Sequence, residues 1–287
     1  PLYDNGEPLN FISILSQLSW ALGYFGMPHI LVRFMAIKNE SEVRKSRKIA
    51  ITWVVISLSV ACLLGAIGRA FFIDAPLDNA ENVFVDMIGK VFTDNLHIPF
   101  IGGLLLCGIL AAIMSTADSQ LLVTASSISE DVYKGVIRKN ASEKSMLWVS
   151  RITVLAVSIV AFIIALDPNS SVMGLVSNAW AGFGATFGPV VLLGLFWRRS
   201  NRIGAAAGMI GGGLMVILWD YIPLGSATLA GYTGVYSLLP GFLFGLILMV
   251  VISLLTAKPT SEMLAEFDDV KRSKGVEMAA PESEVKA

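Results

Sequence analysis

Charged residues are scarce in this chain of 287 residues. Asp, Glu, Lys and Arg together make up 15% of it, whereas 55% is hydrophobic and the mean hydropathy is +0.70. A soluble domain carries about 25% charged residues. So little polar surface excludes a soluble enzyme and a disordered chain, and it leaves an integral membrane protein with several spans.

Histidine and cysteine are also rare, with two of each. His29 and His97 lie far apart in the sequence and indicate no metal site. Cys62 and Cys107 each lie inside an apolar run, so we expect no disulfide. The net charge of −1 offers no basic field for nucleic acid, and the sequence lacks the common nucleotide-binding and hydrolase motifs. We therefore expect neither a nucleic-acid partner nor an enzyme.

Long apolar runs dominate the rest of the sequence. A helix needs about 20 mostly apolar residues to cross a bilayer, and seven segments qualify. They cover residues 11–36, 48–72, 98–126, 147–166, 171–197, 203–222 and 235–256. The sequence therefore predicts an all-α integral membrane protein with seven transmembrane helices.

Positive charge alternates between the segments that join these spans. Of the 21 lysines and arginines, only Arg69 and Lys90 lie in segments that should face outward. Cytoplasmic loops are enriched in Lys and Arg, so the C-terminus is predicted to be cytoplasmic. The polar tail, residues 258–287, has few apolar residues to bury and is predicted to be disordered. Because the chain starts at a proline with no signal peptide after it, we expect it to begin within a longer protein.

The first predicted span contains residues that break a helix. Gly23, Gly26 and Pro28 cluster in its middle, and a broken backbone at membrane depth is tolerated only where protein or a water-filled cavity satisfies it. Discontinuous helices of this kind form the binding sites of many secondary transporters. Trp20 and Tyr24 lie on the same side of the break as Pro28 and suit a small zwitterion with an apolar ring or chain. A proline kink with core aromatics is the alternative.

The third predicted span carries a stripe of hydroxyl groups. Ala112, Ser115, Thr116 and Ser119 fall within one 100° arc of a helix, with Asp118 beside them. Hydroxyl and carbonyl oxygens suit a small hard cation, and an acid in the bilayer is a candidate functional group. The alternative is that the hydroxyls bond to the helix's own carbonyls.

Small residues predict close helix packing further along the chain. Gly204 and Gly208 have the small-xxx-small spacing that lets two membrane helices approach. The preceding basic turn, residues 198–202, is predicted to anchor its arginines to the headgroups of membrane lipids.

Three segments together resemble the solute:sodium symporter family. They are SWALGYFGMPHILVRFMA (19–36), GILAAIMSTADSQLLV (108–123) and GLFWRRSNRIGAAAG (194–208). The resemblance implies a leucine-transporter-like fold of two inverted five-helix repeats. Residues 1–197 would form the second repeat, 198–257 two additional helices and 258–287 the tail. The first repeat is absent, so the chain resembles the C-terminal portion of a symporter and would need the missing N-terminal half as its partner.

The resemblance also implies roles for individual residues. Na⁺ would bind the hydroxyls of Ser115 and Thr116 and the carbonyl of Ala112. Asp118 and Ser119 align near a second cation site of some relatives. The substrate-binding segment would comprise Trp20, Gly23, Tyr24, Gly26 and Pro28.

The function implied is Na⁺-coupled uptake of L-proline across the bacterial cytoplasmic membrane. Two alternatives remain open at this point. One is a symporter of another small solute, such as a sugar, pantothenate or a different amino acid. The other is a membrane sensor that does not transport, although the short tail after Lys258 counts against it.

Overall fold

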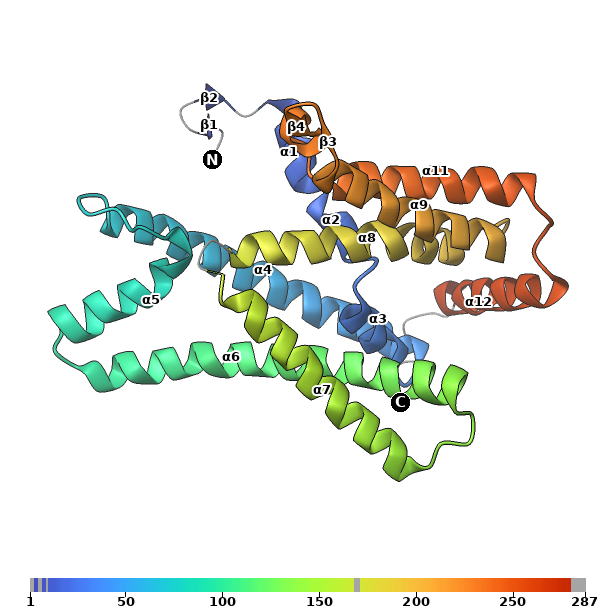
Figure 1. Ribbon diagram of the computed structural model, residues 1–287, viewed down its shortest axis with the longest axis horizontal. Coiled ribbons are helices and arrows are strands. Elements are labelled where there is room, and N and C mark those ends of the chain that lie inside the picture. Colours follow the sequence, from blue (N-terminus) through green and yellow to red (C-terminus); the bar gives the residue numbers. More distant parts are fainter. Residues whose placement is uncertain (1–2, 5–6, 9, 168–170, 280–287) are drawn as a thin grey trace. The chain divides into compact units, whose positions relative to one another are not determined.

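The structure is a computed structural model that describes residues 3–4, 7–8, 10–167 and 171–279. It forms two compact units, which are described separately (Figure 1). One unit joins Pro1–Leu31 to Met173–Ala287, and the other comprises Val32–Val172. These units do not divide the chain at residues 197 and 257, where the sequence predicted boundaries, and the assignment to an inverted repeat stays a prediction.

The first unit is built mainly from helices. It holds α1 (Phe11–Leu18), α2 (Trp20–Gly23), the start of α3 (Pro28–Met35), α8 (Val172–Phe196), α9 (Arg202–Tyr221), α10 (Leu229–Thr233), α11 (Leu238–Leu255) and α12 (Ser261–Ala279). It also holds two short antiparallel hairpins, β1 (Tyr3–Asp4) with β2 (Glu7–Pro8) and β3 (Pro223–Leu224) with β4 (Ala227–Thr228). The second unit holds α4 (Glu40–Phe71), η1 (Ala80–Asn82), α5 (Val83–Ile88), η2 (Gly89–Asn95), α6 (Pro99–Ser126), η3 (Ser127–Ile137) and α7 (Glu143–Ala165).

Six helices in the described residues are long and apolar enough to cross a membrane. They are α4, α6 with η3, α7, α8, α9 and α11, which confirms the six later predicted spans. The first predicted span, residues 11–36, was expected to be a discontinuous helix, and the structure divides it. It consists of α1, α2 and α3, because two glycines and a proline interrupt its middle.

The interruption between α2 and α3 is a turn over residues 24–27. The Gly26 amide donates to the Gly23 carbonyl across 3.0 Å, and the Ile30 amide donates to the Met27 carbonyl across 3.0 Å as α3 begins. Pro28 occupies the first position of α3, where a missing N–H costs no helical hydrogen bond. The helix therefore stops and restarts at the residues that the sequence marked as breakers.

The core of the first unit lies where α8, α9 and α11 meet α2 (Figure 1). Glycines make this approach possible. A methyl group on Gly208 would lie 2.9 Å from Cβ of Met249 and 3.0 Å from the Gly245 carbonyl oxygen, and one on Gly204 would overlap the Ser253 hydroxyl. Backbone therefore packs on backbone between α9 and α11, which confirms the small-residue packing predicted for Gly204 and Gly208.

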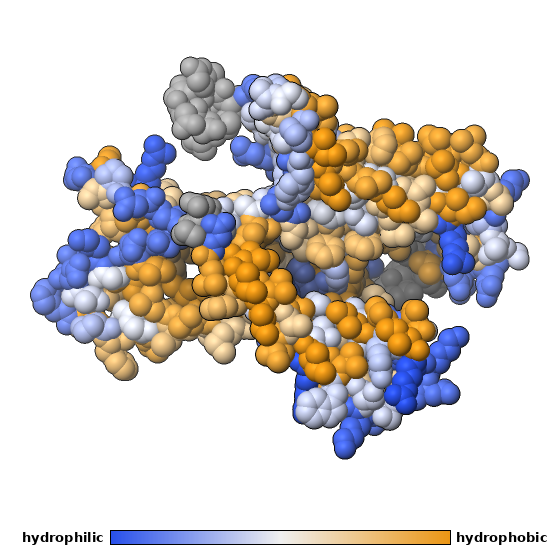
Figure 2. All heavy atoms as spheres, viewed as in Figure 1, coloured by the Kyte–Doolittle hydropathy of each residue, from blue (hydrophilic) through white to orange (hydrophobic). Residues whose placement is uncertain are grey.

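Helices of the second unit have few buried side chains. In the most apolar stretch of α4 no residue is buried, and in α7 only 6% are. Helices α6 and α7 lie against each other, and the hydroxyls of Tyr133 and Ser145 are 2.8 Å apart where η3 meets α7. Figure 2 shows the apolar surface that the helices present, which is the surface expected of segments in contact with lipid or with further membrane helices.

The tail departs from its prediction. Residues 258–287 were expected to be disordered, whereas Ser261–Ala279 form α12; residues 280–287 lie outside the described part. Leu264 and Phe267 are half-buried while Met263 and Val270 remain exposed. The prediction is wrong over α12 because it weighed how few apolar residues the tail has and not their helical spacing, which gives them a common face.

Candidate functional site

Four aromatic residues gather beside the broken helix, and we call them the aromatic cluster: Trp20, Tyr24, Trp180 and Tyr236. The ring of Trp20 stacks on Trp180, with centroids 5.4 Å apart, and on Tyr236, with centroids 5.7 Å apart. Tyr24 meets the Trp180 ring edge-on at 4.9 Å. The structure thus brings Trp20 and Tyr24 together through a third residue, Trp180 of α8.

Trp180 also contacts the main chain beside the break. Its indole Nε1–H donates to the carbonyl oxygen of Trp20 across 2.9 Å, and only 8% of the residue is exposed. Sequence reasoning missed this residue, because one tryptophan in an apolar span looks like ordinary core. The available signal was its N–H, which must find a partner when it is buried in a membrane helix.

Gly23 lets α2 approach α8, and Gly26 lets the following turn do the same. A methyl group on Gly23 would overlap the indole of Trp180, and one on Gly26 would overlap the carbonyl group of Phe183. Both glycines are buried. Their contacts are therefore with α8, while Pro28 is half-buried at the start of α3.

Of the two aromatic cluster residues that the sequence predicted, Tyr24 is the more accessible. It is 49% exposed, and among the described residues none forms a hydrogen bond with its hydroxyl. Trp20 is half-buried, because Trp180 and Tyr236 stack on it. The part of the cluster most accessible to another molecule is thus Tyr24.

The hydroxyl stripe lies on α6, in the second unit. The Ser115 hydroxyl donates to the Ala112 carbonyl across 2.9 Å and the Thr116 hydroxyl donates to the same carbonyl across 3.2 Å. Ser119 donates to the Ser115 carbonyl across 2.8 Å. The alternative foreseen from the sequence, bonding to the helix's own carbonyls, is therefore present.

These hydrogen bonds leave acceptor capacity on the stripe. Each hydroxyl donates its hydrogen to a bond with a carbonyl oxygen and keeps lone pairs that can face a cation. Ser115 and Thr116 are exposed, as are Ala112 and Asp118, while Ser119 is half-buried. No group of three or more His, Cys, Asp or Glu residues suited to a metal exists within the described ranges. The candidate oxygen ligands on α6 are the hydroxyls, main-chain carbonyls and the single carboxylate of Asp118.

The basic turn, residues 198–202, contacts protein instead of pointing only towards lipid. Arg198 forms two hydrogen bonds with the Asp268 carboxylate of α12, at 2.9 and 2.7 Å. Arg199 donates to the Thr256 carbonyl across 2.9 Å. Arg198 and Arg199 thus bond to protein groups, and the anchoring of this turn to lipid headgroups stays a prediction.

Asn201 completes the same turn. Its side-chain oxygen accepts from the Gly204 amide at the start of α9, and its amide nitrogen donates to the Ala257 carbonyl, both across 2.8 Å. The carbonyls after α11 lack helical partners, so the turn closes the end of α11 and begins α9 with one buried side chain.

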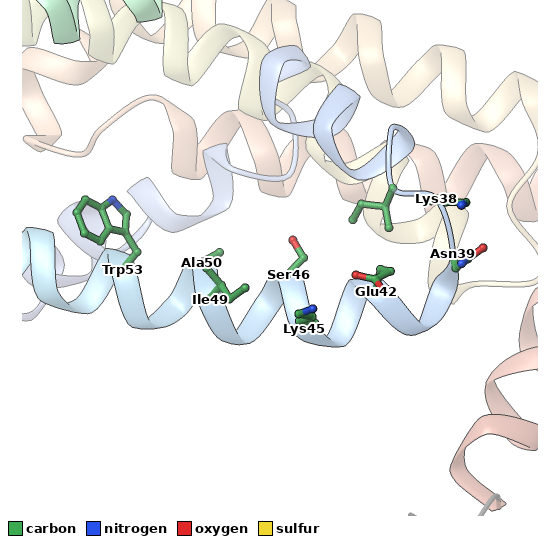
Figure 3. Close-up of a pocket in the computed structure, with 9 residues that line it drawn as sticks. Lys38, Asn39, Glu42, Lys45, Ser46, Ile49, Ala50 and Trp53 are labelled. Atoms are coloured by element: carbon green, nitrogen blue, oxygen red, sulfur yellow. The ribbon is translucent and has the colours of Figure 1, made fainter. Parts of the chain in front are cut away.

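A hollow at the start of α4 involves none of the predicted site residues. Its lining comes from the loop before α4 and one face of the helix (Figure 3). The lining residues are Ile37, Lys38, Asn39, Glu42, Lys45, Ser46, Ile49, Ala50 and Trp53. Lysines alternate there with apolar side chains, as on a membrane-facing surface, and we assign no site to it.

Six long apolar helices and a seventh apolar segment broken beside an aromatic cluster define the class: a multi-pass helical membrane protein with a discontinuous helix, as in secondary transporters. The profile of the sodium:solute symporter family matches residues 4–212. The chain therefore belongs to the sodium:solute symporter family.

Several similar proteins carry proline in their names. The chain is 46% identical over 265 residues to the sodium/proline symporter of Escherichia coli K12, which covers 90% of this chain and 50% of the relative. It is 45% identical over 260 residues to the high-affinity proline transporter PutP of Bacillus subtilis 168. That match covers 90% of this chain and 52% of the relative. The chain spans about half the length of the curated relatives it matches. No solved structure matches it.

Proposed function

We propose that this chain is the C-terminal portion of a symporter that couples the uptake of L-proline to Na⁺. The observation that carries the proposal is the broken helix α2–α3 with its aromatic cluster, in a chain whose relatives are named for proline. An N-terminal half, such as the relatives have, would supply the remaining helices.

Proline recognition would rest on Trp20 and Tyr24 at the break. The substrate's pyrrolidine ring would lie against the exposed aromatic surface, and its carboxylate and ammonium would meet main-chain groups of the turn at 24–27. Burying about four ring carbons at ~0.8 kcal/mol each contributes about 3 kcal/mol before ordering costs. Gly23, Gly26 and Pro28 would shape this turn and hold it against α8.

Na⁺ would bind the hydroxyl stripe of α6. The ligands from this chain would be the hydroxyls of Ser115 and Thr116 and the carbonyl of Ala112, with Asp118 and Ser119 as weaker candidates for a second cation. Coupling requires Na⁺ and proline to favour the same conformation, and such linkage amounts typically to ~1–3 kcal/mol. A membrane potential of 100 mV adds about 2.3 kcal/mol per charge moved.

The test is a hybrid transporter, in which the N-terminal half of the E. coli sodium/proline symporter is followed by this chain. Produced in cells without proline uptake, it should take up labelled proline only with Na⁺. Excess unlabelled proline should abolish the signal, whereas glucose, pantothenate and other amino acids should not. Uptake that ignores Na⁺, or that another of these solutes competes away, contradicts the proposal.

The proposed orientation places the protein in the bacterial cytoplasmic membrane with its C-terminus inside. It rests on the distribution of Lys and Arg. In a hybrid with Cys62 and Cys107 replaced by Ser, a membrane-impermeant thiol reagent should label Asp78→Cys in intact cells. Glu42→Cys and Ser142→Cys should react only after the cells are opened, and external labelling of either overturns the orientation.

A further inference from the structure

Among the described residues, Trp180 is the aromatic residue whose ring contacts both aromatic side chains of the proposed proline site. Its ring stacks on Trp20 at 5.4 Å and receives the edge of Tyr24 at 4.9 Å. Its N–H bonds the Trp20 carbonyl across 2.9 Å. One side chain of α8 therefore contacts the Trp20 ring, the Tyr24 ring and the main chain at Trp20.

The position of Trp180 is itself tightly determined. A methyl group on Gly23 would overlap its indole, so α2 lies directly on the ring. Its neighbour Ala181 is completely buried. Close packing and the Nε1–H hydrogen bond therefore both restrain the indole.

Tyr236, the fourth residue of the aromatic cluster, is also bonded to α8. The Tyr236 hydroxyl donates to the Ser177 carbonyl across 2.6 Å, and the Tyr236 amide donates to the Ser16 hydroxyl of α1 across 2.7 Å. Tyr236 stacks on Trp20 as well. Trp20 is therefore located by two rings that are both fastened to α8.

We propose that Trp180 is a positioning residue of the substrate site, which fixes the spacing of Trp20 and Tyr24 and so decides which ring size the site accepts. This inference rests on the proposed function, in which Trp20 and Tyr24 contact the substrate. Trp180 acts through these two residues. In this proposal, a larger spacing between the Trp20 and Tyr24 side chains admits a larger cyclic amino acid. The spacing that Trp180 fixes excludes it.

The decisive variant is Trp180→Phe in the hybrid transporter. It keeps an aromatic ring, removes the N–H and leaves space beside Trp20 and Tyr24. Loss of one hydrogen bond and part of one ring contact should weaken proline affinity about tenfold. The preference for proline over its six-membered-ring homologue, pipecolate, should narrow by about three- to tenfold, since one methylene in a rigid pocket is worth about ten- to 200-fold.

The matched control is Trp197→Phe, the same substitution directly after the C-terminal end of α8. Trp197 is half-buried and lies in the groove between α8 and α12, away from the aromatic cluster. Its variant should keep both the proline affinity and the preference over pipecolate. Binding is measured at saturating Na⁺ and normalised to folded protein, so that a difference in abundance does not enter either number.

The outcomes separate this inference from the proposed function. Unchanged proline affinity in both Trp20→Ala and Tyr24→Ala contradicts the proposed function of Trp20 and Tyr24 as substrate contacts. Weakened affinity in those variants, with wild-type affinity and discrimination in Trp180→Phe, overturns the role of Trp180 alone. Should Trp180→Phe fail to accumulate, Gly23→Ala decides, because its added methyl displaces the indole without deleting it; normal discrimination there also overturns the inference.

Discussion

The helices α8, α9 and α11 differ sharply from α4, α6 and α7, although both sets are apolar and long enough to span a membrane. In the first set 28–33% of the most apolar stretch is buried, against 0–6% in the second. Glycine is present in both sets, so its number does not explain the difference. A methyl group added to Gly212 would overlap the Ala185 carbonyl, whereas one added to Gly108 of α6 would meet open space.

The two candidate sites, the aromatic cluster and the hydroxyl stripe, lie in regions that differ in burial. The aromatic cluster lies beside the packed set, and Trp180 of α8 contacts the rings of Trp20 and Tyr24 there. The hydroxyl stripe lies on the exposed α6, where its oxygens face outward. A packed region suits a site that must hold its shape, and an exposed oxygen-bearing face suits a site completed by other helices.

The largest effect is expected from Gly212→Val. The added side chain would collide with the backbone of α8, which cannot move aside, and overpacking of this kind costs about 3 kcal/mol or more. Folded hybrid transporter, measured as the monodisperse fraction in detergent, should be nearly lost. Gly108→Val is the control and should accumulate normally; equal loss in both variants would remove the distinction between the two sets of helices.

The next largest effect concerns the exposed face of α6. Ser115→Ala and Thr116→Ala each remove an oxygen ligand, and a contact to a charged group contributes about 1.5–3 kcal/mol. The Na⁺ concentration for half-maximal proline uptake should rise at least about tenfold. Thr124→Ala is the control, because its hydroxyl also bonds its own helix, at Gln120. Normal Na⁺ dependence in the Ser115 and Thr116 variants would leave the stripe as a lipid- or helix-facing surface.

A comparable but smaller effect is expected at the aromatic cluster. Trp20→Ala and Tyr24→Ala each remove one wall, which forfeits about half of the ~3 kcal/mol from the buried ring and weakens proline affinity about tenfold. Core packing alone predicts less folded protein with normal affinity. Equilibrium binding at saturating Na⁺, normalised to folded protein, distinguishes these results.

The smallest effect is expected where the packed set meets α12. Arg198→Ala breaks an ion pair whose guanidinium side chain is 58% exposed, and water and salt screen such pairs. Thermal stability and uptake should stay close to those of the unchanged hybrid. Asn201→Ala is the informative comparison, because it leaves carbonyls at the end of α11 without their donor and removes the cap of α9; it should destabilise by about 1–2 kcal/mol.

Sequence and structure agree where one physical property dominates a segment. Six spans follow from continuous apolar length, and the break at 24–27 follows from glycine and proline chemistry. They disagree where spacing decides, as in the tail, which forms α12 through a shared apolar face. Arg198 finds a carboxylate 70 residues away in the sequence.

The sequence by itself determined the membrane class, the positions of the spans, the broken helix and the oxygen stripe, because apolar length, backbone freedom and helical periodicity are local properties. Only the tertiary structure decided that Gly23 lies on Trp180, that Trp180 holds Trp20 and Tyr24, and that the α9 glycines meet α11. These contacts join residues distant in the chain, and shape complementarity between two helices has no signature in either one alone.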